Sequence, residues 1–164
     1  MNKWHILSWL LSVPVLPPRL RTKIYRLFGM QVDTTARISH GVFIGSRKLT
    51  MKSHTFINFG SFLDGSDEIY LGDYVRVGPC VKILTGTHTY NNSVLRRGPG
   101  STELTKPVIL ERGSWIGMGT IIMPGVSIKE GCIVGAGSVV ISSTEPNGLY
   151  AGNPAKRIKD LPVN

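Results

Sequence analysis

A six-residue repeat in the second half of the 164-residue chain constrains its fold more than any other feature. From residue 110 onward an aliphatic residue stands at every sixth position: Leu110, Ile116, Ile122, Ile128, Val134 and Val140. Four residues after each comes a mostly small residue, usually preceded by glycine: Ser114, Thr120, Val126, Cys132, Ser138 and Thr144. An amphipathic helix buries residues at a period of 3.6 and a half-buried strand at a period of 2, so neither produces this interval. A solenoid of repeated units does.

In a β-helix each six-residue unit can form one flat side of a triangular coil, so three units complete a coil. The aliphatic side chain of each unit then points into the prism, and the small residue fits beside the corner, where glycine tolerates the turn conformation. Stacked coils pair their backbones at a spacing of about 4.8 Å. The repeat therefore predicts an all-β solenoid, a parallel β-helix of about five triangular coils.

The same pattern occurs earlier in the chain, with interruptions. Aliphatic residues at the expected interval are Ile38, Ile44, Met51, Ile57, Leu63, Leu71, Val77 and Ile83. The register slips near residues 47–50 and 66–70, where we expect loops at corners. Between Ile83 and Leu110 the phase is lost, and residues 88–106 are polar and rich in Gly, Ser, Thr and Asn. We expect them to form a loop extruded from the prism, with His88 at its root.

Outside the repeat, the chain divides into an N-terminal helical and amphipathic element (1–30), the β-helix domain (31–152) and a basic C-terminal tail (153–164). The first 18 residues resemble the apolar part of a signal peptide, but no small-x-small cleavage site follows, and prolines interrupt a run too short to cross a bilayer. Residues 19–28 carry four basic residues and helically spaced apolar ones. This element could cap the domain or, with Trp4 and Trp9, contact a membrane surface peripherally.

Composition indicates only the sign of the charge that a binding partner would carry. Nineteen Lys and Arg against ten Asp and Glu give a net charge of +9, which favours phosphates, nucleic acid, acidic glycans or an anionic membrane. Cys80 and Cys132 match no zinc or redox spacing, and we expect both to be free, packed thiols.

Four motifs in order resemble the hexapeptide-repeat acyltransferases, and among them the small O-acetyltransferases related to the maltose and galactoside enzymes. They are INFGSFLD, LGDYVRVGPCVKILTGTH, KPVILERGSWIGMGTIIMPGVSIKEGCIVGAGSVV and AGNPAKRIK. The segments KIYRLFGMQV and TGTHTY look most like members that acetylate sugars of surface polysaccharides. The resemblance implies a left-handed β-helix, a homotrimer and acetyl-CoA bound between neighbouring prisms. It also implies an enzyme that acts on a sugar hydroxyl in the cytoplasm, either free or at the inner face of the cytoplasmic membrane.

His88 matches the histidine that serves as general base in the family. A hydroxyl is a poor nucleophile until its proton is drawn away, and imidazole titrates near neutrality, which suits that task. The resemblance also places Asn58 and Asp64 where relatives contact the acceptor, and Trp115 where an aromatic residue lines the site. No metal is expected for this transfer.

The remaining expected contacts are to acetyl-CoA. The resemblance places an amide that binds the oxyanion or the pantetheine arm near Gly117 and Met118, with Ala136 and Ser142 along the pantetheine path. Lys156 and Lys159 resemble positions at which relatives carry cations for the phosphates of the cofactor.

Several alternatives stay open. The acceptor could be an amine, as in N-acetylation of a nucleotide-linked amino sugar, or a serine hydroxyl, although the serine enzymes carry a long helical N-terminal domain. A zinc hydratase on the same prism needs three converging histidines, and no second histidine follows His88 closely. A non-catalytic module that binds nucleic acid or an acidic glycan is disfavoured by coils of mostly aliphatic and small residues, so we expect no nucleic-acid partner.

Overall fold

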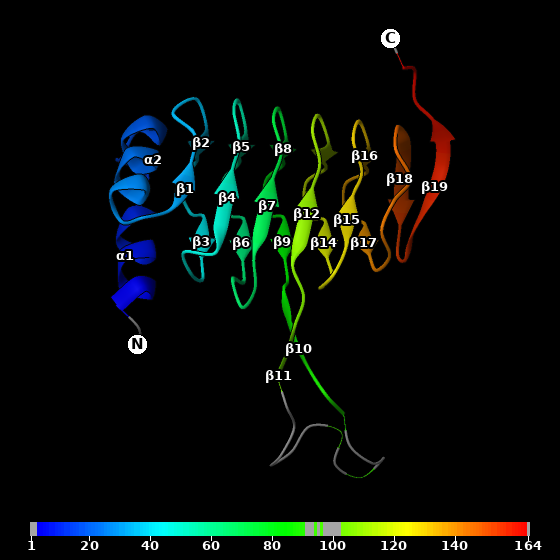
Figure 1. Cartoon of the computed structure of the whole chain (residues 1–164), viewed down its shortest axis with the longest axis horizontal. Helices are drawn as coiled ribbons and strands as arrows, with labels where there is room; N and C mark the ends of the chain where they lie inside the picture. Colours follow the sequence, from blue (N-terminus) through cyan, green and yellow to red (C-terminus); the bar gives the residue numbers. More distant parts are fainter. Residues whose placement is uncertain (1–2, 91–93, 95, 97–102, 164) are drawn as a thin grey trace.

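The structure is a computed structural model and describes residues 3–90, 94, 96 and 103–163. Two short helices, α1 (Lys3–Leu11) and α2 (Pro18–Leu27), precede a prism of stacked strands (Figure 1). Among the described residues, no helix is long and apolar enough to cross a membrane.

Three sheets form the walls of the prism, numbered in the order in which the chain visits them, and their strands are parallel except for the last pair of wall 2. Wall 1 holds β1 (Gln31–Val32), β4 (Leu49–Met51), β7 (Ile69–Leu71), β12 (Val108–Leu110) and β15 (Ser127–Ile128). Wall 2 holds β2 (Arg37–Ile38), β5 (Phe56–Ile57), β8 (Arg76–Val77), β13 (Trp115–Ile116), β16 (Ile133–Val134), β18 (Gly148–Gly152) and β19 (Ala155–Asp160). Wall 3 holds β3 (Phe43–Ile44), β6 (Phe62–Leu63), β9 (Lys82–Ile83), β14 (Ile121–Ile122) and β17 (Val139–Val140).

The core is the column of aliphatic side chains that the repeat predicts. Leu110, Ile116, Ile122, Ile128 and Val134 are fully buried, as are the earlier aliphatics at the same interval. The small partner residues, such as Ser114, Thr120 and Cys132, are also buried. The parallel β-helix is therefore confirmed, but its length differs slightly from the expectation. Because β18 begins another turn after five complete coils, the prism has about six turns rather than about five.

All interruptions of the repeat fall at the corner between wall 3 and wall 1. Residues 45–48 and 64–68 make loops there, as expected from the slips in register. The large interruption leaves the same corner as an antiparallel ribbon of β10 (Gly86–His88) and β11 (Glu103–Thr105), which projects away from the prism (Figure 1). The extruded segment therefore begins as paired strands rather than as irregular chain.

The two ends of the prism are covered differently. At the N-terminal end, α1 packs on β3 while α2 packs on β1 and β2. At the C-terminal end, part of the basic tail forms β19, which pairs antiparallel with β18. Cys80 and Cys132 are both free thiols, and Cys132 is buried.

Candidate functional site

Wall 2 carries a row of large outward-facing side chains. In most of its strands the residue before the buried aliphatic points outward, and the strand register aligns these residues from coil to coil. The row consists of Arg37, Phe56, Arg76, Trp115, Ile133, Leu149 and Lys159. A flat sheet face thereby acquires aromatic, aliphatic and cationic groups at fixed spacing.

Part of this row lines a groove of about 540 Å³ beside the corner between walls 2 and 3. Five residues predicted for the site lie in its lining: Asn58, Trp115, Gly117, Met118 and Ala136. Trp115 and Met118 are each 55% exposed, so their apolar surfaces are available to a ligand. These five predicted residues are up to 78 positions apart in the sequence, and they meet in the groove only because successive coils stack.

The groove's corner is built from glycines that let consecutive coils approach closely. A Cβ on Gly117 would lie 2.5 Å from the nitrogen of Ala136, and one on Gly78 would lie 2.7 Å from the carbonyl oxygen of Ile116. The N–H of Gly117 donates to Val134 within the β-helix at 2.7 Å. The N–H groups of Met118 and Ala136 have no acceptor within the described part of the chain, so they are the donors that this corner offers to a ligand.

Lys156 and Lys159 lie at the C-terminal edge of the same wall. Lys156 pairs with Ala151 and Lys159 with Leu149 across the β18–β19 hairpin, and both lysines are exposed. Since directly paired residues face the same side of a sheet, both cations continue the outer surface of wall 2 beyond the groove.

His88 lies at a different corner from the groove. It ends β10 and is half-buried, and the ribbon register pairs it with Glu103. The groove lies beside Gly78, at one edge of wall 3, and the ribbon leaves from the other edge. Strand β9 runs across wall 3 between them, so this wall separates His88 from the groove of its own chain. Ser142 also lies away from the groove, on the exposed bend after β17.

Asp64 holds the root of the ribbon. Its Oδ2 accepts hydrogen bonds from the N–H of Gly86 at 2.8 Å and from both the N–H and the hydroxyl of Thr85 at 3.1 Å. Burial acts to raise the pKa of Asp64, but the bonds from Thr85, Ser66 and Gly86 outweigh it and leave the pKa below its ordinary value. The carboxylate is therefore charged at neutral pH and fixes the chain two residues before His88.

Asn58 has a local bond as well as a place in the groove. Its Oδ1 accepts from the N–H of Phe59 at 2.8 Å, which orients the amide group. Among the described residues, no three His, Cys, Asp or Glu converge in a way that could hold a metal ion.

Three groups of the site were not anticipated from the sequence. Phe56 and Arg76 also line the groove and are paired neighbours on wall 2. Both could have been found from the repeat, because each stands directly before a buried aliphatic residue, Ile57 or Val77, and such a position faces outward. Glu103 faces His88 across the ribbon, and nothing in the pattern predicted that register.

Comparison with known proteins identifies the architecture. Residues 107–142 match the model described as bacterial transferase hexapeptide (six repeats). A protein of Dictyostelium discoideum, provisionally named an acetyltransferase, is 32% identical over 84% of this chain and 71% of its own length. The chain belongs to the hexapeptide-repeat acetyltransferase family. Its prism is accordingly the left-handed parallel β-helix of that family.

Other relatives of this hexapeptide-repeat protein differ in the acceptor that their names give. The galactoside O-acetyltransferase of Lactococcus lactis is 32% identical over 67% of this chain and 52% of its own length. A Lysinibacillus sphaericus protein, provisionally named a macrolide acetyltransferase, is 56% identical over 57% of this chain and 60% of its own length. The chain spans about half the length of the first curated relatives it matches.

A crystal structure of a hexapeptide-repeat acetyltransferase from Vibrio cholerae superposes with a TM-score of 0.83 at 28% identity, covering 98% of this chain and 90% of that one. A second structure of it, from Vibrio cholerae O1 biovar eltor, is a complex with acetyl coenzyme A. It superposes with a TM-score of 0.74 at 26% identity and covers 98% of this chain and 88% of that one.

Proposed function

We propose that this chain is an acetyl-CoA-dependent O-acetyltransferase that modifies a sugar hydroxyl, in the biosynthesis of a surface polysaccharide such as capsule, O-antigen or exopolysaccharide. The observation that carries the proposal is the groove of wall 2, which gathers five residues expected at the site, with two exposed lysines further along the same wall. Since acetyl-CoA is a cytoplasmic metabolite, we place the reaction in the cytoplasm.

The groove suits the elongated, anionic donor. Trp115 and Met118 offer apolar surface to the pantetheine arm, and the N–H groups of Met118 and Ala136 are donors for its amide oxygens or for a developing oxyanion. Lys156 and Lys159 supply positive charge for phosphates at the end of the same wall. Acetyl-CoA supplies the acetyl group as an activated thioester.

His88 is proposed to take the proton from the acceptor hydroxyl. Asn58, held by its bond to Phe59, would hold a neighbouring hydroxyl and orient the reacting one. Asp64 fixes the root of the ribbon and thereby the position of His88. Glu103, which faces His88 in the ribbon, would orient the imidazole.

The site is proposed to form between chains of a homotrimer. Within one chain, wall 3 separates His88 from the groove, so the ribbon of a neighbouring prism must supply the base. The outer row of wall 3 is mostly apolar (Phe43, Phe62, Lys82, Ile121 and Val139) and includes two phenylalanines whose rings stack 5.0 Å apart. Such a row is a natural surface to face wall 2 of the next copy, and a head-to-tail contact of this kind closes into a ring.

The proposed reaction is tested by measuring release of free thiol from acetyl-CoA with a panel of acceptors. The panel holds galactosides, maltose, oligosaccharides, a nucleotide-linked amino sugar and a macrolide, with products identified by mass spectrometry. We expect a sugar to be the best acceptor and His88→Ala to lower kcat by about 10²–10⁴-fold.

A matched control is His54→Ala, since His54 lies at the corner between walls 1 and 2, stacked on Tyr74 and away from both the groove and the ribbon. This variant should keep its activity. Full activity of a folded His88→Ala enzyme would refute the assignment of the base, and transfer only to an amine would refute O-acetylation.

A further inference from the structure

Helix α1 covers the first coil with its polar groups facing inward. The hydroxyl of Ser8 accepts from the N–H of Ile44 at 2.9 Å, and the indole N–H of Trp4 donates to the carbonyl of Ile44 at 2.8 Å. A ring nitrogen of His5 lies 3.1 Å from the carbonyl oxygen of Gly45. These bonds give hydrogen-bond partners to backbone groups at the edge strand β3, which has no further strand beside it in wall 3.

The outward side of α1 is apolar, which is the reverse of an ordinary surface helix. Ile6, Trp9 and Leu10 follow one another at helical spacing and are exposed, with Trp9 67% exposed, and Val13 in the linker directly after the helix is exposed as well. Eight of the 19 exposed large apolar side chains in the described part of the chain fall within residues 6–28, so the apolar surface is concentrated on this end. A terminal cap of a solenoid normally presents a polar outer face, which keeps the protein soluble.

The chain holds this surface outward through a buried arginine. The guanidinium of Arg21 donates to the carbonyls of Leu11, Val13 and Leu16 in the α1–α2 segment and to that of Ile38 in β2, at 2.6–2.8 Å. These four bonds fasten the linker to the prism. The apolar side of α1 is therefore fixed in an exposed position.

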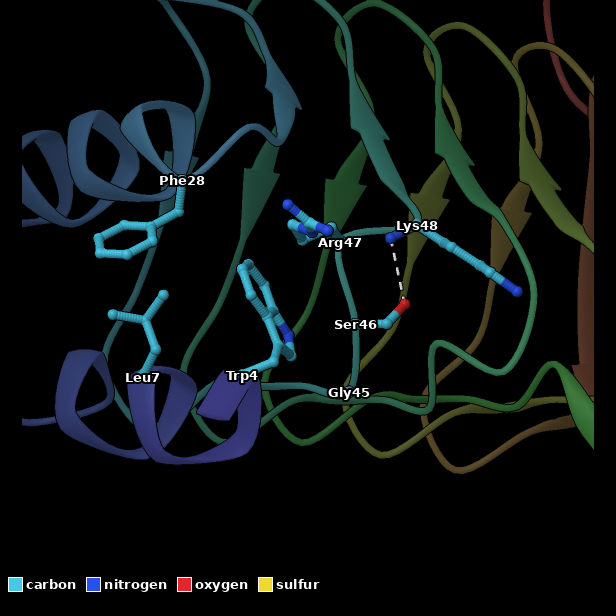
Figure 2. A pocket seen from close by; sticks show the side chains of 7 residues that line it. All are labelled: Trp4, Leu7, Phe28, Gly45, Ser46, Arg47 and Lys48. Carbon is cyan, nitrogen blue, oxygen red and sulfur yellow. Dashed lines mark hydrogen bonds between the residues drawn. The ribbon is translucent and has the colours of Figure 1, made fainter. Parts of the chain in front are cut away.

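Positive charge surrounds the apolar surface. Residues 1–32 contain no Asp or Glu, and Arg19, Lys23 and Arg26 are exposed on α2 beside Leu20 and Leu27. An adjoining hollow of about 760 Å³ continues the pattern (Figure 2). Apolar side chains of Trp4, Leu7 and Phe28 lie on its helical side, and Arg47 and Lys48 lie on the opposite, prism side.

We propose that this cap, formed by α1, α2 and the linker between them, binds the surface of an anionic lipid bilayer. Exposed tryptophan and leucine beside cations is the combination that enters the interface of such a membrane, with the apolar side among the acyl chains and the cations at the headgroups. A second copy facing the first would bring the same cations together, so the charge favours lipid over self-association. With nine residues, α1 lies in the interface and does not cross the bilayer.

The test is flotation of the full-length protein with phosphatidylcholine vesicles, prepared with and without phosphatidylglycerol. We expect binding that requires phosphatidylglycerol and weakens as salt rises. Lys23→Ala combined with Arg26→Ala should weaken it by about 30-fold, and Trp9→Ser combined with Leu10→Ser by at least about tenfold.

Matched controls remove equivalent groups elsewhere. Lys52→Ala combined with Arg112→Ala removes two exposed cations from the prism, and Val163→Ser removes an exposed apolar side chain near the C-terminus. Both variants should bind as the wild type does. His88→Ala should also bind normally, so a failure of the proposed catalysis leaves this result intact.

Failure to float with either vesicle would overturn the proposal, as would equal losses in the control variants. A change in solution mass of the Trp9 and Leu10 variant, without any vesicle binding by the wild type, would assign the surface to a second copy. Binding of an acidic protein or nucleic acid without lipid binding would likewise exclude a membrane. Thermal unfolding of each variant confirms that the fold is kept.

Discussion

At the residue scale, Asp64 connects the repeat to the interruption that carries His88. It lies directly after β6 in wall 3, and it fastens the start of the ribbon through Thr85 and Gly86. Because the pKa of Asp64 is lowered in the folded protein, this anchor is fully charged above the ordinary pKa of an aspartate. It is lost as the pH falls through the lowered value.

Replacing Asp64 distinguishes a positioning role from contact with the acceptor. We expect Asp64→Ala to lower kcat by about 10–100-fold while the KM values for acceptor and acetyl-CoA change little, because only the position of the base is disturbed. Asp64→Asn, which keeps one acceptor oxygen, should recover part of the loss. Steady-state kinetics decide the matter: a raised acceptor KM at unchanged kcat would mean that Asp64 binds the acceptor instead.

At the scale of elements, the buried half of the molecule follows from the sequence and much of its surface does not. Most wall strands could be located from the six-residue spacing of aliphatic residues. Each strand buries one residue in six, as at Ile116 and Val134, and this burial leaves a periodic signal in the sequence. The same spacing also located the corner loops. The ribbon left no such signal, because all three residues of β11 are exposed and no buried side chain marks its register with β10.

The N-terminal cap was recognised as helical, but its orientation could not be read from the residues. Trp4, Trp9 and Leu10 look equivalent in the sequence. They differ only because Ser8 and Trp4 reach the edge of β3, which turns Trp9 and Leu10 outward.

Arg21 provides a test of how this cap is fastened. We expect Arg21→Leu to lower the free energy of unfolding by about 3 kcal/mol, because four carbonyls, two of them in buried hydrogen bonds, lose their donors at once. The matched variant Arg19→Leu, at an exposed position of the same helix, should change it by less than about 0.5 kcal/mol. Chemical denaturation measures both, and equal effects would show that the carbonyl bonds do not hold the cap.

At the scale of the whole molecule, the predicted site residues divide into two sets. Asn58, Trp115, Gly117, Met118 and Ala136 meet in one groove because stacking brings equivalent positions of successive coils together. Lys156 and Lys159 lie further along the same wall. Asp64, His88 and Ser142 lie at the corner between walls 3 and 1, which no periodic signal relates to that groove. The sequence pattern describes one prism, whereas the proposed catalytic arrangement needs two.

Complementation between inactive chains tests this central claim most directly. One chain carries His88→Ala, and the other carries Trp115→Ala with Met118→Ala in the groove. The two are co-expressed, and thiol release from acetyl-CoA is measured with the best acceptor. If each site takes its base from one chain and its groove from the next, random trimers should regain about a quarter of the wild-type activity. Two folded, co-assembled variants that regain no activity would contradict a site shared between chains.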